Sequence, residues 1–466
     1  MNNKYISTLC FLCIALIAVT CQQAADQPNI IFIVADDMGY ADCGVQGCTD
    51  FPTPCLDALA NEGVRFTDGY VTGSVCSPSR AALMTGRYQQ RDGVVDWVRP
   101  DTKGGLNPGV PTVADYLRKA GYRTAMFGKW HLGERDALSP VSRGFDEFFG
   151  FLGGARSYYP DEPTDDAAKE DRYQRLVRGR DPVVETEYTT YAFGREAVDF
   201  IKRQQGGSQP FFLYLAFNAV HTPMHAPADD ADRFAEIPDG RRRTYARMLA
   251  AMDRTIGKVL DAVRETGAEE NTLICFISDN GGPITRNAPN KSSNEPLRGG
   301  KGEAWEGGIR VPFFVKWTGR LQAGSVFREP VTQMDLTATA LALAGVEAAA
   351  EWPMDGLDLM PILTGKQDMP QRTLYWYVPT NAKQWAIRRG NWKLTTALPE
   401  KVKTTVTGLY DLGSDIGESN DLTASHPGLA KELQAEWEAW HAEVMPDQAA
   451  HSQIPSSSSA EGEFNH

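Results

Sequence analysis

The stretch Asn29-Ile-Ile-Phe-Ile-Val-Ala-Asp-Asp37 is an apolar run of strand length that ends in two aspartates. Side chains alternate between the two faces of a strand, so an unbroken apolar run is typical of a parallel sheet between two layers of helices. Similar runs lie at residues 123–127, 210–217 and 272–278, and polar residues follow each of them. We therefore expect a mainly parallel sheet that includes residues 29–35.

Helical patterns separate these runs, at residues 55–62, 112–120, 189–204 and 245–266. Alternation of strands and helices predicts an α/β fold, with a large, mainly parallel sheet flanked by helices. In open sheets of this type, ligands bind beyond the carboxyl ends of the strands. The polar residues that follow the four runs are therefore expected to meet in one site.

The pattern changes towards the C-terminus. Residues 385–394 and 408–412 have the character of strands in a small antiparallel sheet, and a final amphipathic helix follows them. We expect a main domain at residues 26–365, which carries the site at the edge of the large sheet, and a C-terminal subdomain, a smaller antiparallel sheet plus a helix, at residues 366–445. The polar, Ser-rich residues 446–466 are predicted to form a disordered tail.

Residues 1–25 are typical of an export signal, because a lysine precedes an apolar run that is too short to span a bilayer. We expect the mature chain to be exported to the periplasm or the cell surface. Cys21 is a candidate lipid-anchor site, since residues 18–21 loosely match a lipoprotein cleavage box, although Thr20 fits that box poorly.

Five of the eight cysteines lie beyond this signal, an odd number for an oxidising compartment. Cys43 and Cys48 could pair across a loop, and Cys275, inside an apolar run, is expected to be a buried small hydrophobe. The formal net charge of −13 argues against a nucleic-acid partner, because we find no cluster of Lys and Arg to bind phosphates. A local positive cluster in a cleft could still bind a small anion.

Residues 74–87, SVCSPSRAALMTGR, place a single thiol at the start of a helical pattern. Ser77 is suited to cap this helix, the following proline to begin it, and Gly86 to end it. Cys76 is thus expected at a helix N-terminus, where backbone N–H groups and the helix dipole favour an anion. Arg80 follows one helical turn later.

The sequence Cys-x-Pro-Ser-Arg at residues 76–80, followed by Thr-Gly-Arg at residues 85–87, resembles the signature of type I sulfatases in the alkaline-phosphatase-like superfamily. The resemblance covers residues from about 28 to 445 and implies the fold of that superfamily. It also implies that a maturation enzyme oxidises Cys76 to formylglycine, an aldehyde. One hydroxyl of the hydrated aldehyde would attack the sulfur of a sulfate ester, and the other, once deprotonated, would expel the sulfate.

The resemblance extends to a set of metal ligands, which are Asp36, Asp37, Asp279 and Asn280 together with the modified side chain of Cys76. Carboxylate and amide oxygens are hard ligands that suit Ca²⁺ or Mg²⁺ rather than zinc. The resemblance favours Ca²⁺, which would polarise the sulfate oxygens.

Arg80, Lys129 and Lys301 match the family's cations near the sulfate, and His131 and His221 match its acid–base residues. Lys129 and His131 are two residues apart, so an extended segment would place both on one side. The resemblance implies that His221, helped by Lys301, protonates the leaving sugar oxygen. It implies that His131 assists deprotonation of the diol.

Further residues are candidates for contact with the substrate. Three of them could bind it, or could be solvated residues of a rim loop: Arg156, Ser157 and His225. Aromatic residues could stack on sugar rings or belong to the core: Tyr158, Tyr159, Trp305 and residues 375–377.

The resemblance and the export signal favour a sulfated saccharide as substrate, with galactose or N-acetylgalactosamine units of a polysaccharide. One alternative is a phosphodiesterase or phosphonate hydrolase of the same superfamily, which a mixed set of His and Asp ligands would have favoured. Another is an inactive binder of sulfated glycans. The presence of every expected polar residue argues against it. A thiol phosphatase is excluded, because its Cys-x₅-Arg spacing falls on Ala82.

Overall fold

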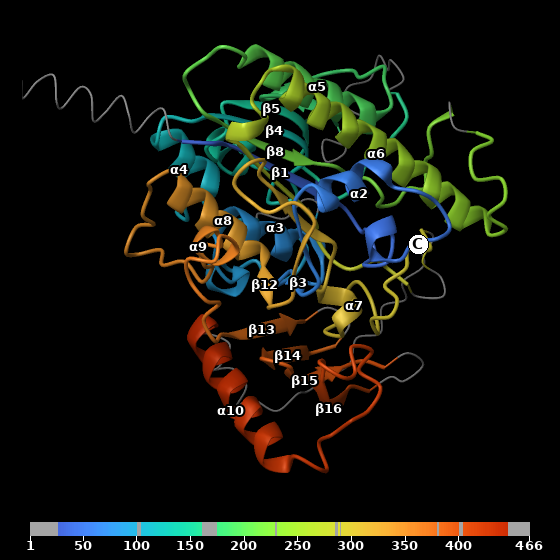
Figure 1. Ribbon diagram of the computed structural model, residues 1–466, viewed down its shortest axis with the longest axis vertical. Coiled ribbons are helices and arrows are strands. Elements are labelled where there is room, and N and C mark those ends of the chain that lie inside the picture. Colours follow the sequence, from blue (N-terminus) through green and yellow to red (C-terminus); the bar gives the residue numbers. More distant parts are fainter. Residues whose placement is uncertain are drawn as a thin grey trace, which may run out of the picture.

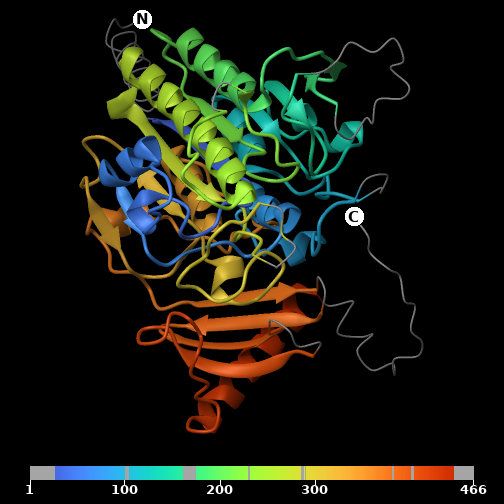
Figure 2. The ribbon, with the colours of Figure 1, turned by 90° about the vertical axis from the view of Figure 1, so that its right-hand side faces the viewer.

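The computed structural model describes residues 27–99, 104–160, 175–228, 231–284, 288, 290–379, 382–399 and 404–445. Within them, a ten-stranded sheet is covered by helices on both faces, and a four-stranded antiparallel sheet lies at one end of the molecule (Figure 1; Figure 2). The predicted export signal, the candidate anchor Cys21 and the predicted tail lie outside these residues. No helix of the described part is long and apolar enough to cross a membrane.

The large sheet contains all four of the predicted strands. From edge to edge its strands are β11 (Ser325–Phe327), β2 (Val64–Phe66), β10 (Phe313–Lys316), β9 (Thr272–Ser278), β1 (Asn29–Ala35), β8 (Phe211–Ala216), β4 (Arg123–Lys129), β5 (Glu147–Phe151), β6 (Val177–Arg178) and β7 (Asp181–Pro182). The strands from β9 to β5 are parallel, and Val34 of β1 pairs with both Ala216 of β8 and Ile277 of β9. The prediction of a mainly parallel sheet is confirmed.

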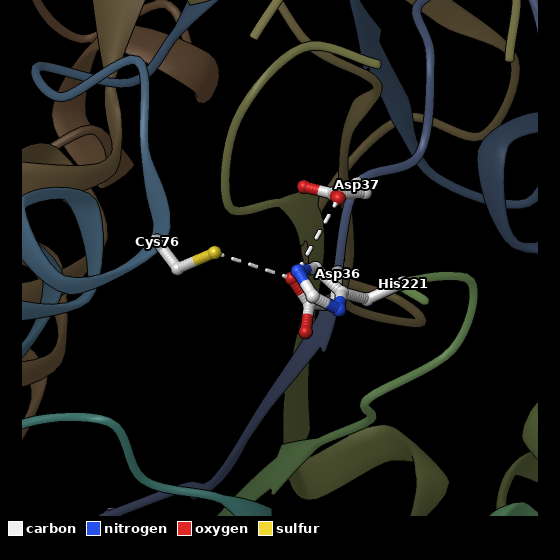
Figure 3. Close-up of side chains that lie close together, drawn as sticks. All are labelled: Asp36, Asp37, Cys76 and His221. Carbon is white, nitrogen blue, oxygen red and sulfur yellow. Dashed lines mark hydrogen bonds and ion pairs between the residues drawn. The ribbon is translucent and has the colours of Figure 1, made fainter. Parts of the chain in front are cut away.

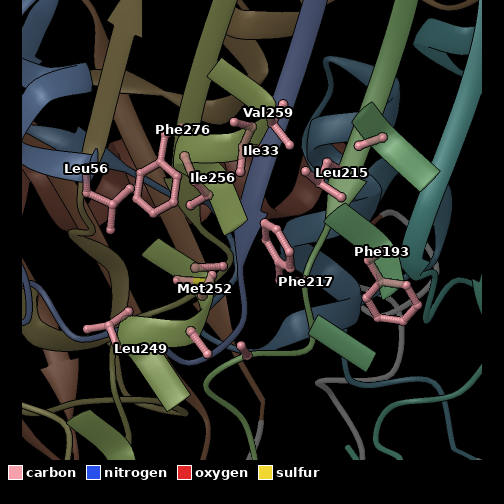
Figure 4. Packing of buried hydrophobic residues seen from close by; sticks show 14 of the residues in the cluster. Ile33, Leu56, Phe193, Leu215, Phe217, Leu249, Met252, Ile256, Val259 and Phe276 are labelled. Carbon is pink, nitrogen blue, oxygen red and sulfur yellow. The ribbon is translucent and has the colours of Figure 1, made fainter. Parts of the chain in front are cut away.

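The two faces of this sheet form two hydrophobic cores. Ile31 and Ile33 belong to one core, and Ile30 and Phe32 to the other, because side chains alternate along β1. The first core packs against α2 (Pro54–Asn61), α5 (Thr189–Arg203) and α6 (Gly240–Glu265), as Figure 4 shows for part of the cluster. The second packs against α3 (Cys76–Thr85), α4 (Val113–Lys119), α8 (Gln333–Leu343) and α9 (Met360–Leu363).

Three of the four helical patterns predicted between the strands, those of α2, α4 and α5, agree with the structure to within one residue at each end, and the fourth is α6. This helix begins at Gly240, five residues before the predicted start at residue 245. Asp239 caps it, since its carboxylate accepts hydrogen bonds from the backbone N–H groups of Arg241 and Arg242 at 2.8 and 3.3 Å. Consecutive arginines in the first turn carry no apolar period, so the sequence pattern missed this turn.

The small sheet consists of β13 (Thr373–Val378), β14 (Gln384–Arg389), β15 (Trp392–Ala397) and β16 (Val406–Asp411). The predicted strand at residues 385–394 is in fact a hairpin, which turns at Gly390 with φ of 59°. The final helix α10 (Pro427–Val444) covers one face of the sheet with Leu433 and Trp437 (Figure 1). The other face, with Trp376, packs towards the large domain.

Short elements link the two sheets. They are β3 (Gly69–Tyr70), which pairs with β12 (Val331–Thr332), and α7 (Glu306–Ile309). The five cysteines of the described residues are free thiols, so Cys43 and Cys48 are not paired. Cys275 is buried within β9, as expected for a small hydrophobe.

Candidate active site

The carboxyl edge of the large sheet gathers the predicted polar residues. Asp36 and Asp37 follow β1, Asp279 follows β9, Lys129 ends β4, and His221 lies in the loop after β8. The backbone N–H of Asp36 donates to Ala219 and that of Asp279 donates to Ala35, so hydrogen bonds between neighbouring strands continue into the loops. Figure 3 shows Asp36, Asp37 and His221 facing the thiol of Cys76. The expected convergence on one edge is confirmed.

Cys76 is the first residue of α3, and its thiol donates to Asp36 Oδ1 at 3.4 Å. The expectations that Ser77 caps the helix and that Pro78 begins it are wrong, because the helix already begins at Cys76. Val75 occupies the capping position, and the hydroxyl of Ser77 instead accepts a hydrogen bond from the N–H of Val98 at 2.9 Å. Gly86 ends the helix as predicted, in the left-handed conformation with φ of 69°.

The thiol of Cys76 is not activated as a thiolate. Burial and the charge of Asp279 raise its pKa to about 12, although Lys129 and Lys301 act in the opposite direction. A helix N-terminus lowers the pKa of an exposed cysteine, but here complete burial outweighs that effect. The unmodified side chain is therefore a neutral thiol and a poor nucleophile at neutral pH.

Groups that could hold a metal ion lie around this thiol. One ligand atom from each of Asp36, Asp37, Cys76 and His221 lies within 4.8 Å of the others. The amide of Asn280 donates to Asp37 Oδ1 at 2.8 Å, while its buried Oδ1 has no hydrogen-bond partner in the described part of the chain. A buried, unpartnered oxygen beside carboxylates is what a hard cation requires, so these residues fit Ca²⁺ or Mg²⁺.

Three cations neutralise the three carboxylates. Lys129 Nζ lies 2.6 Å from Asp36, and Lys301 Nζ lies 2.7 Å from Asp37 and 3.5 Å from the sulfur of Cys76. Arg80 binds Asp279 through two nitrogens, at 2.7 and 3.0 Å. It also donates to the carbonyl oxygen of Lys129 at 2.9 Å, which joins the cysteine helix to β4.

The pKa values of two of these carboxylates are shifted in opposite directions. Although burial opposes ionisation, Lys129, His221 and Arg80 hold the pKa of Asp36 well below its ordinary value. Burial and the charge of Asp36 raise the pKa of Asp279 to about 6. An added cation would favour ionisation of both.

The two histidines have different environments. Nδ1 of His221 lies 2.7 Å from the carbonyl oxygen of Thr222, to which it must donate, so Nε2 faces Asp37 Oδ2 at 3.7 Å. Nε2 of His131 lies 3.1 Å from the carbonyl oxygen of Val98, and its buried Nδ1 has no hydrogen-bond partner among the described residues. Burial lowers the pKa of both rings, and that of His131 falls well below its ordinary value.

The geometric argument for pairing Lys129 with His131 is wrong. The strand ends at Lys129, and His131 has a positive φ of 57°, so the two residues do not share one extended segment. His131 is held instead by its N–H, which donates to the carbonyl oxygen of Leu152 at 3.1 Å. It still lies close enough to Lys129 for that charge to lower its pKa.

The predicted substrate residues lie together on one rim. Ser157 Oγ is 3.2 Å from Nδ1 of His225, and the ring of Tyr159, 45% exposed, stacks on the imidazole of His225 at 4.5 Å. Arg156 is buried, and its Nε donates to the carbonyl oxygen of Ser157 at 2.8 Å. Of the candidate aromatics for sugar stacking, Tyr159 is exposed on this rim.

The other aromatic candidates belong mostly to the core. Trp305, Trp376 and Tyr158 are buried, and Tyr375 stacks on Trp440 of α10 at 4.9 Å. The hydroxyl of Tyr158 contacts the carbonyl oxygen of Asn218 and that of His221, the latter at 2.7 Å. Tyr158 thus fixes the loop of His221, a role that its sequence context did not reveal.

At this edge of the sheet, carboxylates and positively charged side chains surround one buried side chain. The carboxylates suit a divalent cation and the positive charges suit an anionic ester, as in hydrolases of phosphate and sulfate esters. A family model described as Sulfatase matches residues 28–346. A second, described as N-sulphoglucosamine sulphohydrolase, C-terminal, matches residues 301–442. The chain belongs to the sulfatase family and is a sulfuric ester hydrolase.

Named relatives and solved structures agree with this assignment. The chain is 35% identical over 368 residues to N-acetylgalactosamine-6-sulfatase of Canis lupus familiaris, covering 76% of this chain and 69% of that protein. It is 34% identical over 449 residues to human arylsulfatase A, covering 88% and 86%. The structure of Ps i-CgsB in complex with k-i-k-neocarrahexaose superposes with a TM-score of 0.84 at 36% identity, covering 90% of this chain and 94% of that one. PsFucS1 sulfatase from Pseudoalteromonas sp. gives 0.77 at 26% identity, covering 93% of each chain.

Proposed function

We propose that this sulfatase removes sulfate from galactose or N-acetylgalactosamine units of a sulfated polysaccharide, with Cys76 converted to formylglycine and Ca²⁺ bound beside it. The environment of Cys76 carries the proposal, because a buried neutral thiol among three carboxylates and three cations is not itself a nucleophile. Relatives named N-acetylgalactosamine-6-sulfatase, and a neighbour solved with k-i-k-neocarrahexaose, support a carbohydrate substrate.

The hydrated aldehyde supplies one hydroxyl that attacks sulfur and a second that expels sulfate once it is deprotonated. The residues suited to hold Ca²⁺ beside it are Asp36, Asp37, Asp279 and Asn280, and the cation would supply charge to polarise the sulfate oxygens. Lys129 and Lys301 place further positive charge next to the same position. Arg80 orients Asp279 through two hydrogen bonds.

The two histidines are assigned to different proton transfers. With Nδ1 donating to Thr222, neutral His221 has a lone pair on Nε2, which must first take up a proton beside Asp37. We assign the resulting imidazolium to return that proton to the leaving sugar oxygen, with help from Lys301. With Nε2 donating to Val98, His131 presents the lone pair of its buried Nδ1. Its lowered pKa keeps His131 neutral, which suits a group that takes a proton from the diol.

The rim formed by Ser157, Tyr159 and His225 is suited to a sugar. An exposed aromatic ring offers a face for stacking on the apolar side of a sugar, and the neighbouring imidazole offers a polar edge for a hydroxyl. We assign these residues, with Arg156, to substrate binding. We also propose that the chain is exported to the periplasm or cell surface, that Cys21 carries a lipid anchor, and that a maturation enzyme acts on Cys76.

The test combines one chemical and one catalytic measurement. The protein is co-expressed with a formylglycine-generating enzyme, and the peptide containing Cys76 is analysed by mass spectrometry for conversion of thiol to aldehyde. The matured enzyme is then screened for sulfate release from defined sulfated galactose and N-acetylgalactosamine oligosaccharides, with and without Ca²⁺. Cys76→Ala should fold without activity, whereas Cys275→Ala, a matched change at a second buried cysteine, should keep it.

Each alternative function predicts a different result. Release of phosphate from phosphate diesters or phosphonates, without sulfate from any ester, would favour a phosphohydrolase. Binding of sulfated glycans without turnover by the matured, Ca²⁺-loaded protein would favour an inactive binder. An active enzyme with an unmodified thiol at position 76 would contradict the proposed nucleophile.

A further inference from the structure

Residues 298–306, here called the Lys301 segment, lie between the catalytic edge and the small sheet. On the catalytic side, the backbone N–H of Lys301 donates to Gly282 at 3.2 Å and that of Gly302 donates to Ser74 at 2.9 Å. Gly282 lies just beyond Asn280, and Ser74 lies two residues before Cys76. The backbone beside Lys301 is thus tied to both the metal-ligand loop and the nucleophile loop.

The small sheet holds the other side of the Lys301 segment through Gln384, the first residue of β14. This side chain is fully buried, and its amide Nε2 donates to the carbonyl oxygen of Gly302 at 3.0 Å. Its Oε1 accepts from the N–H of Ala304 at 3.4 Å and from that of Leu398 at 3.1 Å. One amide therefore joins two positions of the segment to the small sheet.

The Lys301 segment fixes only part of its shape by itself, through a turn in which Glu303 N–H donates to the carbonyl oxygen of Gly300 at 3.0 Å and Gly300 N–H donates to the Glu303 carboxylate at 2.9 Å. Its sequence is Arg-Gly-Gly-Lys-Gly-Glu-Ala-Trp-Glu, and Gly299 and Gly302 both have positive φ, at 73° and 81°. Glycine is conformationally permissive, so contacts outside the stretch are also needed to hold it in one conformation. Other contacts hold the ends, where Glu306 N–H donates to Glu418 at 2.7 Å and Trp305 Nε1 donates to Leu398 at 3.1 Å. Gln384 provides the contact from the small sheet to Gly302, the residue next to Lys301.

We propose that Gln384 is a positioning residue for Lys301, so that the C-terminal sheet takes part in catalysis by setting where this lysine meets the reacting ester. The proposal rests on the role of Lys301 in the proposed function. The lysine Nζ lies 3.5 Å from the sulfur of Cys76, within reach of any group that replaces the thiol. Misplacement of a catalytic group by about 1 Å can lower the rate by roughly a hundredfold.

Two substitutions and one control separate positioning from general stability. Gln384→Met keeps the size of the side chain and removes its hydrogen bonds. Gln384→Glu keeps the acceptor for Ala304 and Leu398, but an ionised carboxylate cannot donate to Gly302 and would repel its carbonyl oxygen. The control is Thr395→Val, since Thr395 is also fully buried in this sheet and its hydroxyl donates to the carbonyl oxygen of Trp385 rather than to the Lys301 segment.

The first measurement is steady-state kinetics of the matured enzyme. Both Gln384 variants should lower kcat by about tenfold or more with KM changed less, whereas Thr395→Val should leave kcat within about twofold of wild type. In a Lys301→Ala background, Gln384→Glu should cause no further loss, because the group that it positions is gone. An equal further loss in that background would overturn the proposal.

The second measurement does not require activity. Hydrogen exchange of the peptide spanning residues 298–306 should be faster in Gln384→Met than in wild type and unchanged in Thr395→Val. Unchanged exchange in both Gln384 variants would overturn the tether even if kcat fell. If the wild-type enzyme released no sulfate from any ester, the proposed function would fail, while the exchange result would still decide whether Gln384 holds the segment.

Discussion

Tyr158 shows how a residue without reacting chemistry can serve the site. Its buried hydroxyl contacts the carbonyl oxygens of Asn218 and His221, on either side of the turn that presents the imidazole. Tyr158→Phe should keep the packing of the ring and lower kcat about tenfold, with a loss of about 1 kcal/mol in the free energy of unfolding. Steady-state kinetics and urea unfolding would measure both effects.

Tyr122→Phe is the matched control for this prediction. Its hydroxyl is buried and has no hydrogen-bond partner in the described part of the chain, so its removal should leave both kcat and stability near wild type. If the two substitutions had the same effect on kcat, Tyr158 would be a packing residue without a role in placing His221.

Asp92 is a buried carboxylate that the proposed reaction does not use. Burial raises its pKa from 3.8 to about 6, although Arg87 lies 3.8 Å away and opposes the shift. Between these values the folded state keeps a proton that the unfolded state has lost, so the contribution of Asp92 to stability falls as pH rises. Above pH 6 the ionised, buried carboxylate should cost about 1 to 3 kcal/mol.

Asp92→Asn should therefore raise the free energy of unfolding above neutral pH by that amount and change it little near pH 4. Urea unfolding of wild type and variant across this range would measure the difference. The exposed Asp181→Asn should leave the pH dependence as in wild type. A variant curve parallel to that of wild type would mean that Asp92 already ionises normally in the folded protein.

Gly128 allows the strands β4 and β8 to lie close together directly before the catalytic-site residue Lys129. Its φ is 115°, and a Cβ atom built there would lie 1.8 Å from the carbonyl oxygen of Ala216 in the neighbouring strand β8. Gly128→Ala must push these strands apart directly before Lys129. The expected loss of stability exceeds about 4 kcal/mol, which would be seen as loss of soluble protein or a large fall in Tm.

Gly121→Ala provides the comparison for this strand. Gly121 also has a positive φ, 94°, but no atom lies within 4 Å of a Cβ built there. Its substitution should cost about 1 to 2 kcal/mol, from backbone strain alone. Equal tolerance of the two alanines would contradict the close approach of β4 and β8 beside the site.

A helix or strand could be predicted where its own residues show a clear pattern of apolar and polar side chains. The buried strands such as β1 and β9 were predicted with their bounds, because a short apolar run rich in β-branched and aromatic residues favours a strand that is covered on both faces. The first turn of α6 was missed, since three arginines interrupt its apolar period. The strand β13 was missed because its aromatic residues are equally typical of a core and of a sugar-binding rim.

At the scale of the molecule, the sequence predicts which residues meet in the site wherever the strands of the sheet bring them together. Parallel strands end at one edge, so Asp36, Lys129 and Asp279 had to meet once the sheet was known. The tautomers of the histidines and the tie between Gln384 and Gly302 could not be predicted. They join residues far apart in the chain through single hydrogen bonds, which leave no periodic signal in the sequence.

A buried charge network joins the two sheets behind this site. Lys393 of the small sheet lies 2.9 Å from Glu306 of α7 and 2.8 Å from Glu418, and all three side chains are fully buried. Breaking a buried pair leaves an uncompensated charge, so this network opposes separation of the sheets. The small sheet is therefore a fixed support against which the Lys301 segment is held.

Cation binding should stabilise the whole molecule, because Asp36, Asp279 and Asn280 come together at one edge of the sheet only when the chain is folded. A ligand that binds the folded state alone adds about 2.7 kcal/mol at a concentration one hundred times its Kd. Ca²⁺ should thus raise the Tm of the matured protein by a few degrees, and a chelator should reverse the shift and abolish turnover. Asn280→Leu removes the unpartnered amide oxygen and should reduce the shift, whereas Asn271→Leu, at the opposite end of β9, should not. A Tm that Ca²⁺ leaves unchanged, or raises equally in both variants, would show that this edge does not hold the cation.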